Sequence, residues 1–237
     1  MRAFIKHSGQ RSTWRIMAGV GLQMERSRLV PSRYVWEQYP SIKDLTVPMG
    51  DVRFHSSNMD PYELYCLSAL ALLRRPRLIF EFGTFDGATT LALARLLPES
   101  TILTLDLPDE LSESAILAQA EGRGSSASGE RFHDTPEQDR ITQLYGDSRS
   151  FDYTPWFGKI DMVVIDAGHD YECVRADTQA ALRLMSESAA VIWDDYCPLW
   201  PGVVKAVDEA SARGMAVPVH LRGTEMAVWD RGVSPVE

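Results

Sequence analysis

Residues 79–90 read Ile-Phe-Glu-Phe-Gly-Thr-Phe-Asp-Gly-Ala-Thr-Thr, an apolar run that passes through an acidic residue into a glycine turn and then a helical pattern. In a parallel α/β sheet, ligands bind outside the carboxyl ends of the strands, where such a turn offers free backbone N–H groups. Gly83 and Gly87 have the spacing G-x-x-x-G, and Phe85 stands where a dinucleotide fingerprint needs its middle glycine. The turn therefore predicts a cofactor that has a ribose and a charged amino-acid tail but no phosphates.

A second acidic residue follows at the distance that nucleoside-binding α/β proteins use. Residues 100–107 have the pattern of a strand that ends near Asp106, about 20 residues beyond the turn. A carboxylate at that strand end is placed to accept hydrogen bonds from both ribose hydroxyls. The plainer interpretations are a turn former before Pro108 for Asp106, and a helix-capping or surface carboxylate for Glu81.

The two motifs, in this order and at this spacing, resemble those of the class I S-adenosylmethionine-dependent methyltransferases. The resemblance lies in residues 81–87 and in Asp106. It implies an α/β fold with a Rossmann-like sheet of about seven strands, mostly parallel, with helices on both faces and S-adenosylmethionine as cofactor. It also implies which residues of these motifs bind the cofactor, namely Glu81, Gly83, Thr84, Gly87 and Asp106.

The composition predicts one catalytic domain preceded by an N-terminal extension. The chain has 237 residues, of which 45% are hydrophobic, enough for one substantial core. Residues 1–58 are assigned to an N-terminal arm and cap, because residues 1–33 are rich in arginine and residues 31–58 in aromatic residues and proline. Residues 59–237 are assigned to the S-adenosylmethionine-binding domain. The arm is expected to pack on a partner subunit of a homo-oligomer or over the active site, unless translation starts further downstream.

Charge and cysteine content exclude several classes of partner. The formal net charge of −9 and the pI of about 5.1 argue against a nucleic-acid partner, because phosphate binding needs a basic face. The apolar stretch at residues 16–22 contains two glycines and is too short to span a membrane. The three cysteines have neither metal-ligand spacing nor the density of a disulfide scaffold. We therefore expect no membrane association and a reducing, cytoplasmic location.

Apolar periodicity predicts the remaining elements. Residues 122–129, Gly-Arg-Gly-Ser-Ser-Ala-Ser-Gly, are expected to be a flexible run that is either a substrate lid or a tolerated surface insertion. The last two strands are expected to form an antiparallel pair at one edge of the sheet. The helix predicted over residues 60–74 has Asp60 as its expected N-cap and Pro61 in its first turn. Further helices are predicted over residues 89–97, 111–120, 174–185 and 202–210, and further strands over residues 140–145, 160–165, 189–193, 216–221 and 225–229.

The strand at residues 140–145 leads into Gly146-Asp147-Ser148. In the methyltransferases that this chain resembles, an acidic or polar residue here lies beside the adenine and accepts a hydrogen bond from its exocyclic amine. The resemblance therefore implies that Asp147 binds the cofactor. The plainer interpretation is an ordinary turn aspartate.

Three carboxylates follow two buried strands of the predicted sheet. A near-continuous β-branched run at residues 160–165 leads to Asp166. The strand at residues 189–193 leads to Asp194 and Asp195. Carboxylates that converge in one pocket repel one another, and protons, a basic side chain or a divalent cation can neutralise them. These three residues therefore predict a magnesium site beside the cofactor's methyl group, and Asp166 is also predicted to contact the cofactor and to take part in catalysis.

Residues 165–171, Ile-Asp-Ala-Gly-His-Asp-Tyr, and residues 192–196, Ile-Trp-Asp-Asp-Tyr, resemble one methyltransferase branch in particular. This branch includes macrolide sugar and aminocoumarin sugar O-methyltransferases, several of which use magnesium. Metal-dependent relatives often carry a second acid two residues after the first, where this chain has Gly168. With that acid missing, His169 is predicted to accept the proton, because an unperturbed histidine is largely neutral at physiological pH. The plainer interpretation is a loop histidine bonded to the backbone.

The sequence thus predicts methyl transfer from S-adenosylmethionine to an oxygen of a small hydroxylated acceptor, with magnesium assistance as one version of the mechanism. Two other classes stay open because a fold does not determine its chemistry. One is another enzyme on the same fold, hydroxylase-like or nucleotide-using. The other is a non-catalytic protein that keeps the cofactor pocket. The intact glycine turn favours cofactor binding, and the acidic strand ends favour turnover.

Overall fold

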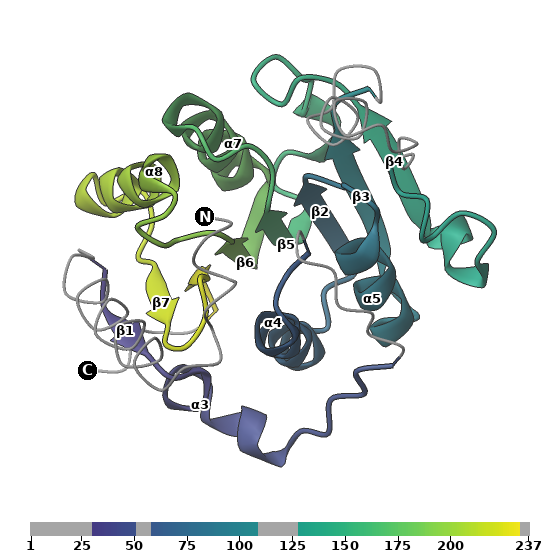
Figure 1. Cartoon of the computed structure of the whole chain (residues 1–237), viewed down its shortest axis with the longest axis horizontal. Helices are drawn as coiled ribbons and strands as arrows, with labels where there is room; N and C mark the ends of the chain where they lie inside the picture. The colour runs from purple at the N-terminus through teal and green to yellow at the C-terminus, as the bar shows by residue number, and fades with distance from the viewer. Residues whose placement is uncertain (1–29, 51–57, 109–127, 233–237) are drawn as a thin grey trace, which may run out of the picture.

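The computed structural model of the protein describes residues 30–50, 58–108 and 128–232, which form three layers with one sheet in the middle (Figure 1). Eight strands lie in the order β1-β7-β8-β6-β5-β2-β3-β4, and all neighbours are parallel except those of β8. The strands are β1 (Ser32–Arg33), β2 (Leu78–Phe82), β3 (Thr101–Asp106), β4 (Ile141–Tyr145), β5 (Ile160–Ile165), β6 (Met185–Trp193), β7 (Val219–Leu221) and β8 (Ala227–Asp230). The helices are α3 (Val35–Gln38), η1 (Pro40–Asp44), α4 (Pro61–Arg74), α5 (Ala88–Leu96), η3 (Pro136–Arg140), η4 (Thr154–Trp156), α7 (Tyr171–Leu184) and α8 (Pro201–Ala212).

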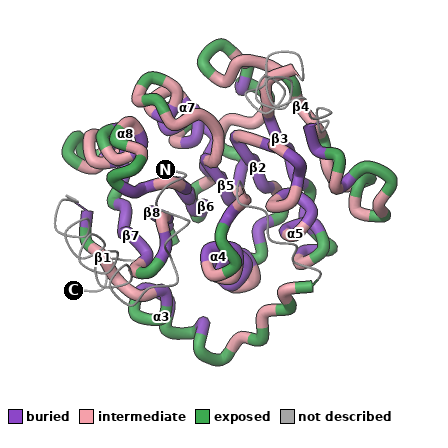
Figure 2. Tube along the Cα trace, in the orientation of Figure 1, coloured by how far each residue is buried: buried purple, intermediate pink, exposed green. Residues whose placement is uncertain are grey.

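The predicted Rossmann-like α/β sheet with helices on both faces is confirmed. Helices α4 and α5 cover one face, where Leu93 belongs to the same buried cluster as Ile79. Helices α7 and α8 cover the other face, where Val207 belongs to the same cluster as Phe80. Ile79 and Phe80 are neighbours on β2, so the alternation of a strand sends one side chain into each core. Figure 2 shows that the central strands are buried along most of their length.

The register of the central strands decides where the functional residues meet. Phe82 at the end of β2 is paired with Leu105 of β3 and with Ile165 of β5. Ile165 is in turn paired with Trp193 at the end of β6. Four strands therefore end side by side, and the residues that follow these four positions are Gly83, Asp106, Asp166 and Asp194.

Helix α4 begins at the cap predicted from the sequence. Asp60 accepts a hydrogen bond from the backbone of Tyr62 at 2.8 Å, and Glu63 accepts one from the backbone of Asp60 at 3.1 Å. Pro61 occupies the first helical position, where its missing N–H has no cost. This cap sets the start of α4 at the sheet edge that carries the site.

The sheet has one strand more than the seven or so expected, because the described part of the predicted N-terminal cap contributes β1. Ser32 and Arg33 pair in parallel with β7. The buried His220 secures this contact, since its Nδ1 lies 2.9 Å from Ser32 Oγ and its Nε2 lies 2.8 Å from the carbonyl oxygen of Thr224. A carbonyl only accepts, so Nε2 carries the proton and the Ser32 hydroxyl donates to Nδ1.

Two element predictions need correction. Strand β6 begins at Met185 and not at residue 189, because Met185 pairs with Ile160 before an irregularity in the register. Polar residues 186–188 conceal this part of the strand in the apolar pattern. The expected antiparallel pair of β7 and β8 is present, but β1 lies outside it and forms the edge of the sheet. The predicted helix at residues 111–120, the arm at residues 1–29 and most of residues 122–129 lie outside the described residues.

Asp177, on the buried side of α7, carries a fully buried carboxyl group. Its Oδ2 lies 3.6 Å from Cys173 Sγ, and its Oδ1 has no hydrogen-bond partner among the described residues. Burial raises the pKa of Asp177 to about 6. The folded protein therefore keeps a proton that the unfolded chain releases near pH 4. Stability from this group is present at low pH and is lost as the pH rises toward about 6.

We predict that Asp177→Asn raises the free energy of unfolding at pH 8, by up to about 3 kcal/mol, because the amide removes a buried charge. At pH 4 the gain should be small. Thermal or urea denaturation at the two pH values measures both effects. Asp152→Asn is the matched control, since this exposed carboxylate accepts hydrogen bonds from Thr154 that lower its pKa, and its loss should cost stability at pH 8. An equal gain for Asp177→Asn at both pH values would contradict the prediction.

Candidate active site

The glycine turn after β2 passes very close to the end of β5. Gly83 has a φ of +88°, and a Cβ added to it would lie 1.9 Å from the carbonyl oxygen of Asp166. The backbone N–H of Asp166 donates to the carbonyl of Phe82 at 2.9 Å. Both the positive φ and the close approach therefore require glycine at position 83.

Asp106 holds the turn in shape. Its Oδ2 accepts hydrogen bonds from the backbone N–H groups of Thr84 at 3.1 Å and Phe85 at 2.8 Å. Its Oδ1 accepts from the backbone of Leu107 at 2.7 Å. Phe85 has a φ of +48°, which is uncommon for a residue with a side chain. The carboxylate predicted to bind a ribose thus also stabilises the strained turn beside it.

Glu81 is placed deeper than the sequence suggested. Its side chain is only 1% exposed and accepts hydrogen bonds from the hydroxyls of Thr104, at 2.6 Å, and Thr90. The Thr104 hydroxyl is also 2.7 Å from that of Thr84, so a chain of hydroxyls connects Glu81 with the turn. Burial raises the pKa of Glu81 to about 7. Its carboxyl group lies between the sheet and α5, and its role as a cofactor ligand stays a prediction.

Asp147 follows β4 at the same end of the sheet and remains partly exposed. Its carboxylate accepts hydrogen bonds from the Arg149 guanidinium, at 2.9 Å from Nε and 2.6 Å from Nη2, and from the Arg149 backbone at 2.9 Å. These bonds lower the pKa of Asp147. The carboxylate is therefore ionised and able to accept from an adenine amine, but that contact stays a prediction.

The three carboxylates after β5 and β6 lie in one region but in different environments. Burial, followed by the charge of Asp195, raises the pKa of the half-buried Asp166 carboxyl group. Burial, followed by the charge of Asp166, raises the pKa of Asp194, whose Oδ1 has no partner among the described residues. No group of three His, Cys, Asp or Glu side chains in the described part of the chain is arranged to hold a metal ion.

Asp195 is engaged with His169 and not with the other two acids. His169 Nε2 lies 2.7 Å from Asp195 Oδ2. The imidazole also stacks on Trp200, with ring centroids 4.0 Å apart and planes 22° apart. Asp195 has a φ of +58°, which is the left-handed conformation that turns its side chain back toward the histidine loop. The arrangement fixes the ring of His169 from two sides, as a general base requires.

The two aromatic residues beyond Asp195 have different roles. Tyr196 is fully buried and its hydroxyl donates to Asp208 at 2.5 Å, so it belongs to the core. Trp200 supports His169 and is partly exposed. Of the two, only Trp200 is exposed enough to form part of the wall of an acceptor pocket.

Sequence reasoning missed Asp86, which lies inside the glycine turn. Its carboxylate accepts from the backbone of Ala88 at 3.0 Å, from Arg131 Nε at 2.6 Å and from Asn58 Nδ2 at 3.2 Å. Asp86 thus connects the start of α5 with two segments that are distant in sequence. The Asp-Gly pair at the turn was the available signal, but its long-range partners have no local pattern.

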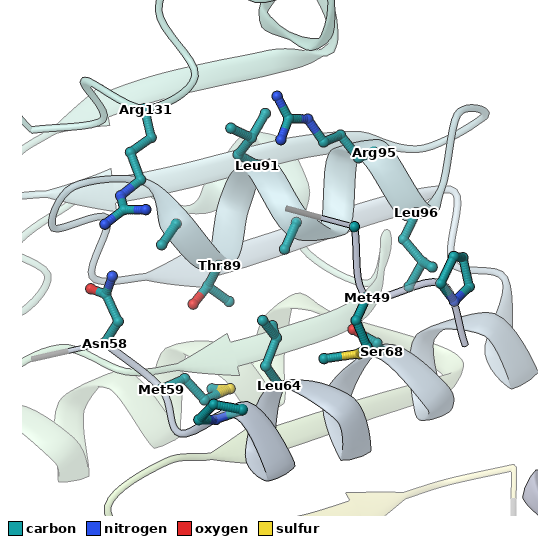
Figure 3. A pocket seen from close by; sticks show the side chains of 15 residues that line it. Met49, Asn58, Met59, Leu64, Ser68, Thr89, Leu91, Arg95, Leu96 and Arg131 are labelled. Carbon is teal, nitrogen blue, oxygen red and sulfur yellow. The ribbon is translucent and has the colours of Figure 1, made fainter. Parts of the chain in front are cut away.

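A cavity of about 190 Å³ opens beside this turn, between α4 and α5. Leu64 of α4 and Leu91 of α5 are among its lining residues, and Figure 3 shows Asn58 and Arg131 toward one end, with Arg95 and Leu96 toward the other. Its walls are largely apolar, with polar side chains near the first turn of α5, such as Thr89 and Arg131, and others further along the two helices, Ser68 and Arg95. A largely apolar cavity with a few polar groups is typical of small-molecule sites.

Comparison with known proteins connects this geometry with a family. Residues 80–196 match the family model of a methyltransferase domain, a range that contains the glycine turn, Asp106 and His169. Residues 80–196 form a methyltransferase domain. The class I methyltransferase identity inferred from the turn and Asp106 is thereby confirmed. No curated protein matches the sequence significantly.

Solved methyltransferase structures share the fold at low sequence identity. An O-methyltransferase from Bacillus cereus, in complex with S-adenosylhomocysteine, has a TM-score of 0.54 and 19% identity, covering 85% of this chain and 92% of its own. A Podospora anserina methyltransferase bound to S-adenosylhomocysteine has a TM-score of 0.56 and 18% identity, covering 94% and 95%. The O-methyltransferase TomG from Streptomyces achromogenes, involved in tomaymycin synthesis and in complex with S-adenosylmethionine, has a TM-score of 0.51 and 21% identity, covering 86% and 92%.

We predict that Gly83→Ala prevents the methyltransferase domain from forming its cofactor turn, because the added methyl group meets the Asp166 carbonyl. Gly158→Ala is the matched control, since Gly158 also has a positive φ of +69° but nothing within 4 Å of its added Cβ. The control should lose only about 1–2 kcal/mol of stability from backbone strain. Urea denaturation of both variants measures the difference. Equal losses would contradict a role for the close approach.

Proposed function

We propose that this methyltransferase transfers a methyl group from S-adenosylmethionine to an oxygen of a small hydroxylated acceptor. The observation that carries the proposal is the Asp106 carboxylate beside the glycine turn, inside a methyltransferase domain. The Bacillus cereus and Streptomyces achromogenes proteins support it, because both are described as O-methyltransferases in complex with the cofactor or its product.

The cofactor fits the turn better than a dinucleotide would. We infer that Asp106 accepts hydrogen bonds from the ribose hydroxyls and that the cavity beside Thr89 takes the amino-acid tail. A pyrophosphate would need the N-terminus of α5, but the carboxylate of Asp86 already accepts from the backbone of Ala88 there. Because two anions repel each other at one helix N-terminus, this arrangement disfavours the alternative of a nucleotide-using enzyme.

The chain's own task in the reaction is to orient the acceptor and to remove its proton. S-adenosylmethionine, when bound, supplies an activated methyl group on a sulfonium. His169 is our candidate for the proton acceptor, and Asp195 Oδ2, 2.7 Å from its Nε2, orients the imidazole ring. The carboxylate also stabilises the imidazolium that forms, as in other histidine–carboxylate pairs. Asp166, at the end of β5, lies beside this pair and is proposed to face the reacting groups.

Magnesium fits the described residues only in part. Asp194 Oδ1 is a buried oxygen without a partner, of the kind that a hard cation binds. However, Asp195 is bonded to His169, and the described residues contain no group of three suitable ligands. The proposed magnesium site at Asp166, Asp194 and Asp195 therefore stays a prediction, and the mechanism above does not use it.

The cellular setting is a further part of the proposal. Among the described residues, no helix is long and apolar enough to span a membrane. The net charge of −9 supports an enzyme that works without nucleic acid. We place the enzyme in the cytoplasm, with residues 1–58 as arm and cap and residues 59–237 as the catalytic domain. The arm is proposed to contact a second subunit.

We predict that S-adenosylhomocysteine raises the melting temperature and that NAD does not. A ligand at 100 times its dissociation constant adds about 2.7 kcal/mol of stability. Asp106→Ala should remove most of this shift, because it removes the ribose acceptor and loosens the turn. Asp139→Ala, at an exposed acid on η3, is the control and should keep the full shift. A shift with NAD but not with S-adenosylhomocysteine would refute the proposed cofactor.

We predict that His169→Ala lowers kcat by about 10²-fold or more, the range expected for loss of a general base. Asp195→Asn should lower kcat less and move the acid limb of the pH–rate profile to lower pH, because the amide no longer stabilises the imidazolium. EDTA should have little effect on the wild-type rate. Loss of activity on chelation and its recovery with Mg²⁺ would instead support the three-carboxylate metal site.

A further inference from the structure

Residues 128–132 lie directly on the glycine turn, although they follow it by some 45 positions in the chain. The backbone N–H of Gly129 donates to the carbonyl of Phe85 at 2.8 Å, and that of Arg131 donates to the carbonyl of Asp86 at 3.0 Å. Phe132 is 2% exposed, and its ring would lie 2.7 Å from a Cβ added to Gly87. The contact is thus a close-packed one, with no room for a side chain at position 87.

The turn beneath these residues is strained and is held from both sides. Phe85 has a φ of +48°, its N–H is bonded to Asp106, and its carbonyl is bonded to Gly129. Without such partners, a residue with a side chain would leave this conformation readily. Residues 128–132 therefore contribute to the shape that the cofactor turn adopts.

One ion pair secures this contact. Asp86 is 7% exposed, and its Oδ2 lies 2.6 Å from Arg131 Nε. The same oxygen accepts from Asn58, which connects the residues before α4 to the same point. Because Asp86 is nearly buried, removing the guanidinium leaves a carboxylate without its main counter-charge. The resulting loss of stability affects the glycine turn, because Asp86 is part of that turn.

We propose that Arg131 is a positioning residue for the cofactor, acting through Asp86 to preorganise the glycine turn. This inference rests on the proposed function, since it concerns the same cofactor site. Arg131 does not need to touch the reacting atoms. It keeps Thr84, Phe85 and Asp106 in the arrangement that binds the ribose, so that binding does not have to order them.

The experiment compares Arg131→Ala and Arg131→Lys with the wild type by calorimetric titration with S-adenosylhomocysteine, well below the melting temperature. We expect Arg131→Ala to raise the dissociation constant about tenfold or more, with a similar rise in KM for S-adenosylmethionine and little change in kcat. Lysine restores the charge but not the planar guanidinium, and should recover part of the affinity. Arg175→Ala, which breaks the exposed pair with Glu172 on α7, is the control and should leave the dissociation constant unchanged.

A double-mutant cycle with Asp86→Asn separates positioning from general destabilisation. If the two residues act as a pair, Asp86→Asn with Arg131→Ala should weaken binding little more than either change alone. Unchanged affinity in Arg131→Ala would overturn the inference. A fall in kcat as large as the rise in KM, which Arg131→Lys does not reverse, would overturn it as well. A wild-type protein that does not bind S-adenosylhomocysteine would defeat the proposed function itself, which keeps the two failures apart. Where Arg131→Ala does not fold, Arg131→Lys and Asp86→Asn give the same comparison.

Discussion

The close approach of Gly83 to the Asp166 carbonyl is the constraint on which the rest of the site depends. It lets the ends of β2 and β5 lie side by side, so the cofactor turn borders the loop that carries His169. The parallel register then adds Asp106 from β3 and Asp194 from β6 at the same edge. A side chain at position 83 would separate the turn from the acids. The proposed site needs both the turn and the acidic strand ends.

The acids of the site fall into two groups by their counter-charges. Asp86 and Asp195 each have a basic partner, in Arg131 and His169. Glu81, Asp166 and Asp194 take part in none of the ion pairs found among the described residues, and burial raises the pKa of each. The paired acids fix loops. Of the unpaired ones, Asp166 and Asp194 follow the ends of β5 and β6, whereas Glu81 lies between the sheet and α5. Structural and chemical tasks are thus divided between residues of the same type.

Local patterns predicted the parts of this structure that depend on neighbouring residues. The cap at Asp60, the glycine turn and the buried strand at residues 160–165 all follow from spacing over a few positions. The burial of Glu81 was not predicted, because its hydroxyl partner Thr104 is 23 positions away in the chain. The same holds for the Asp86–Arg131 pair. Contacts of this kind depend on the register between strands and on loop packing, which no local pattern encodes.

The unpaired acids explain why a methyl-donating cofactor suits this edge. Asp177 and Asp166 are both carboxyl groups whose pKa is raised by burial, but only Asp166 lies where a ligand is proposed to bind. A sulfonium is a cation, so its binding would favour the ionised form of nearby acids and offset their burial. A neutral thioether, which remains after the methyl group has left, offers no such compensation. Buried acids at this sheet edge make the folded protein less stable than apolar side chains would. In the proposed reaction the same acids would bind the cationic S-adenosylmethionine more tightly than the neutral thioether product.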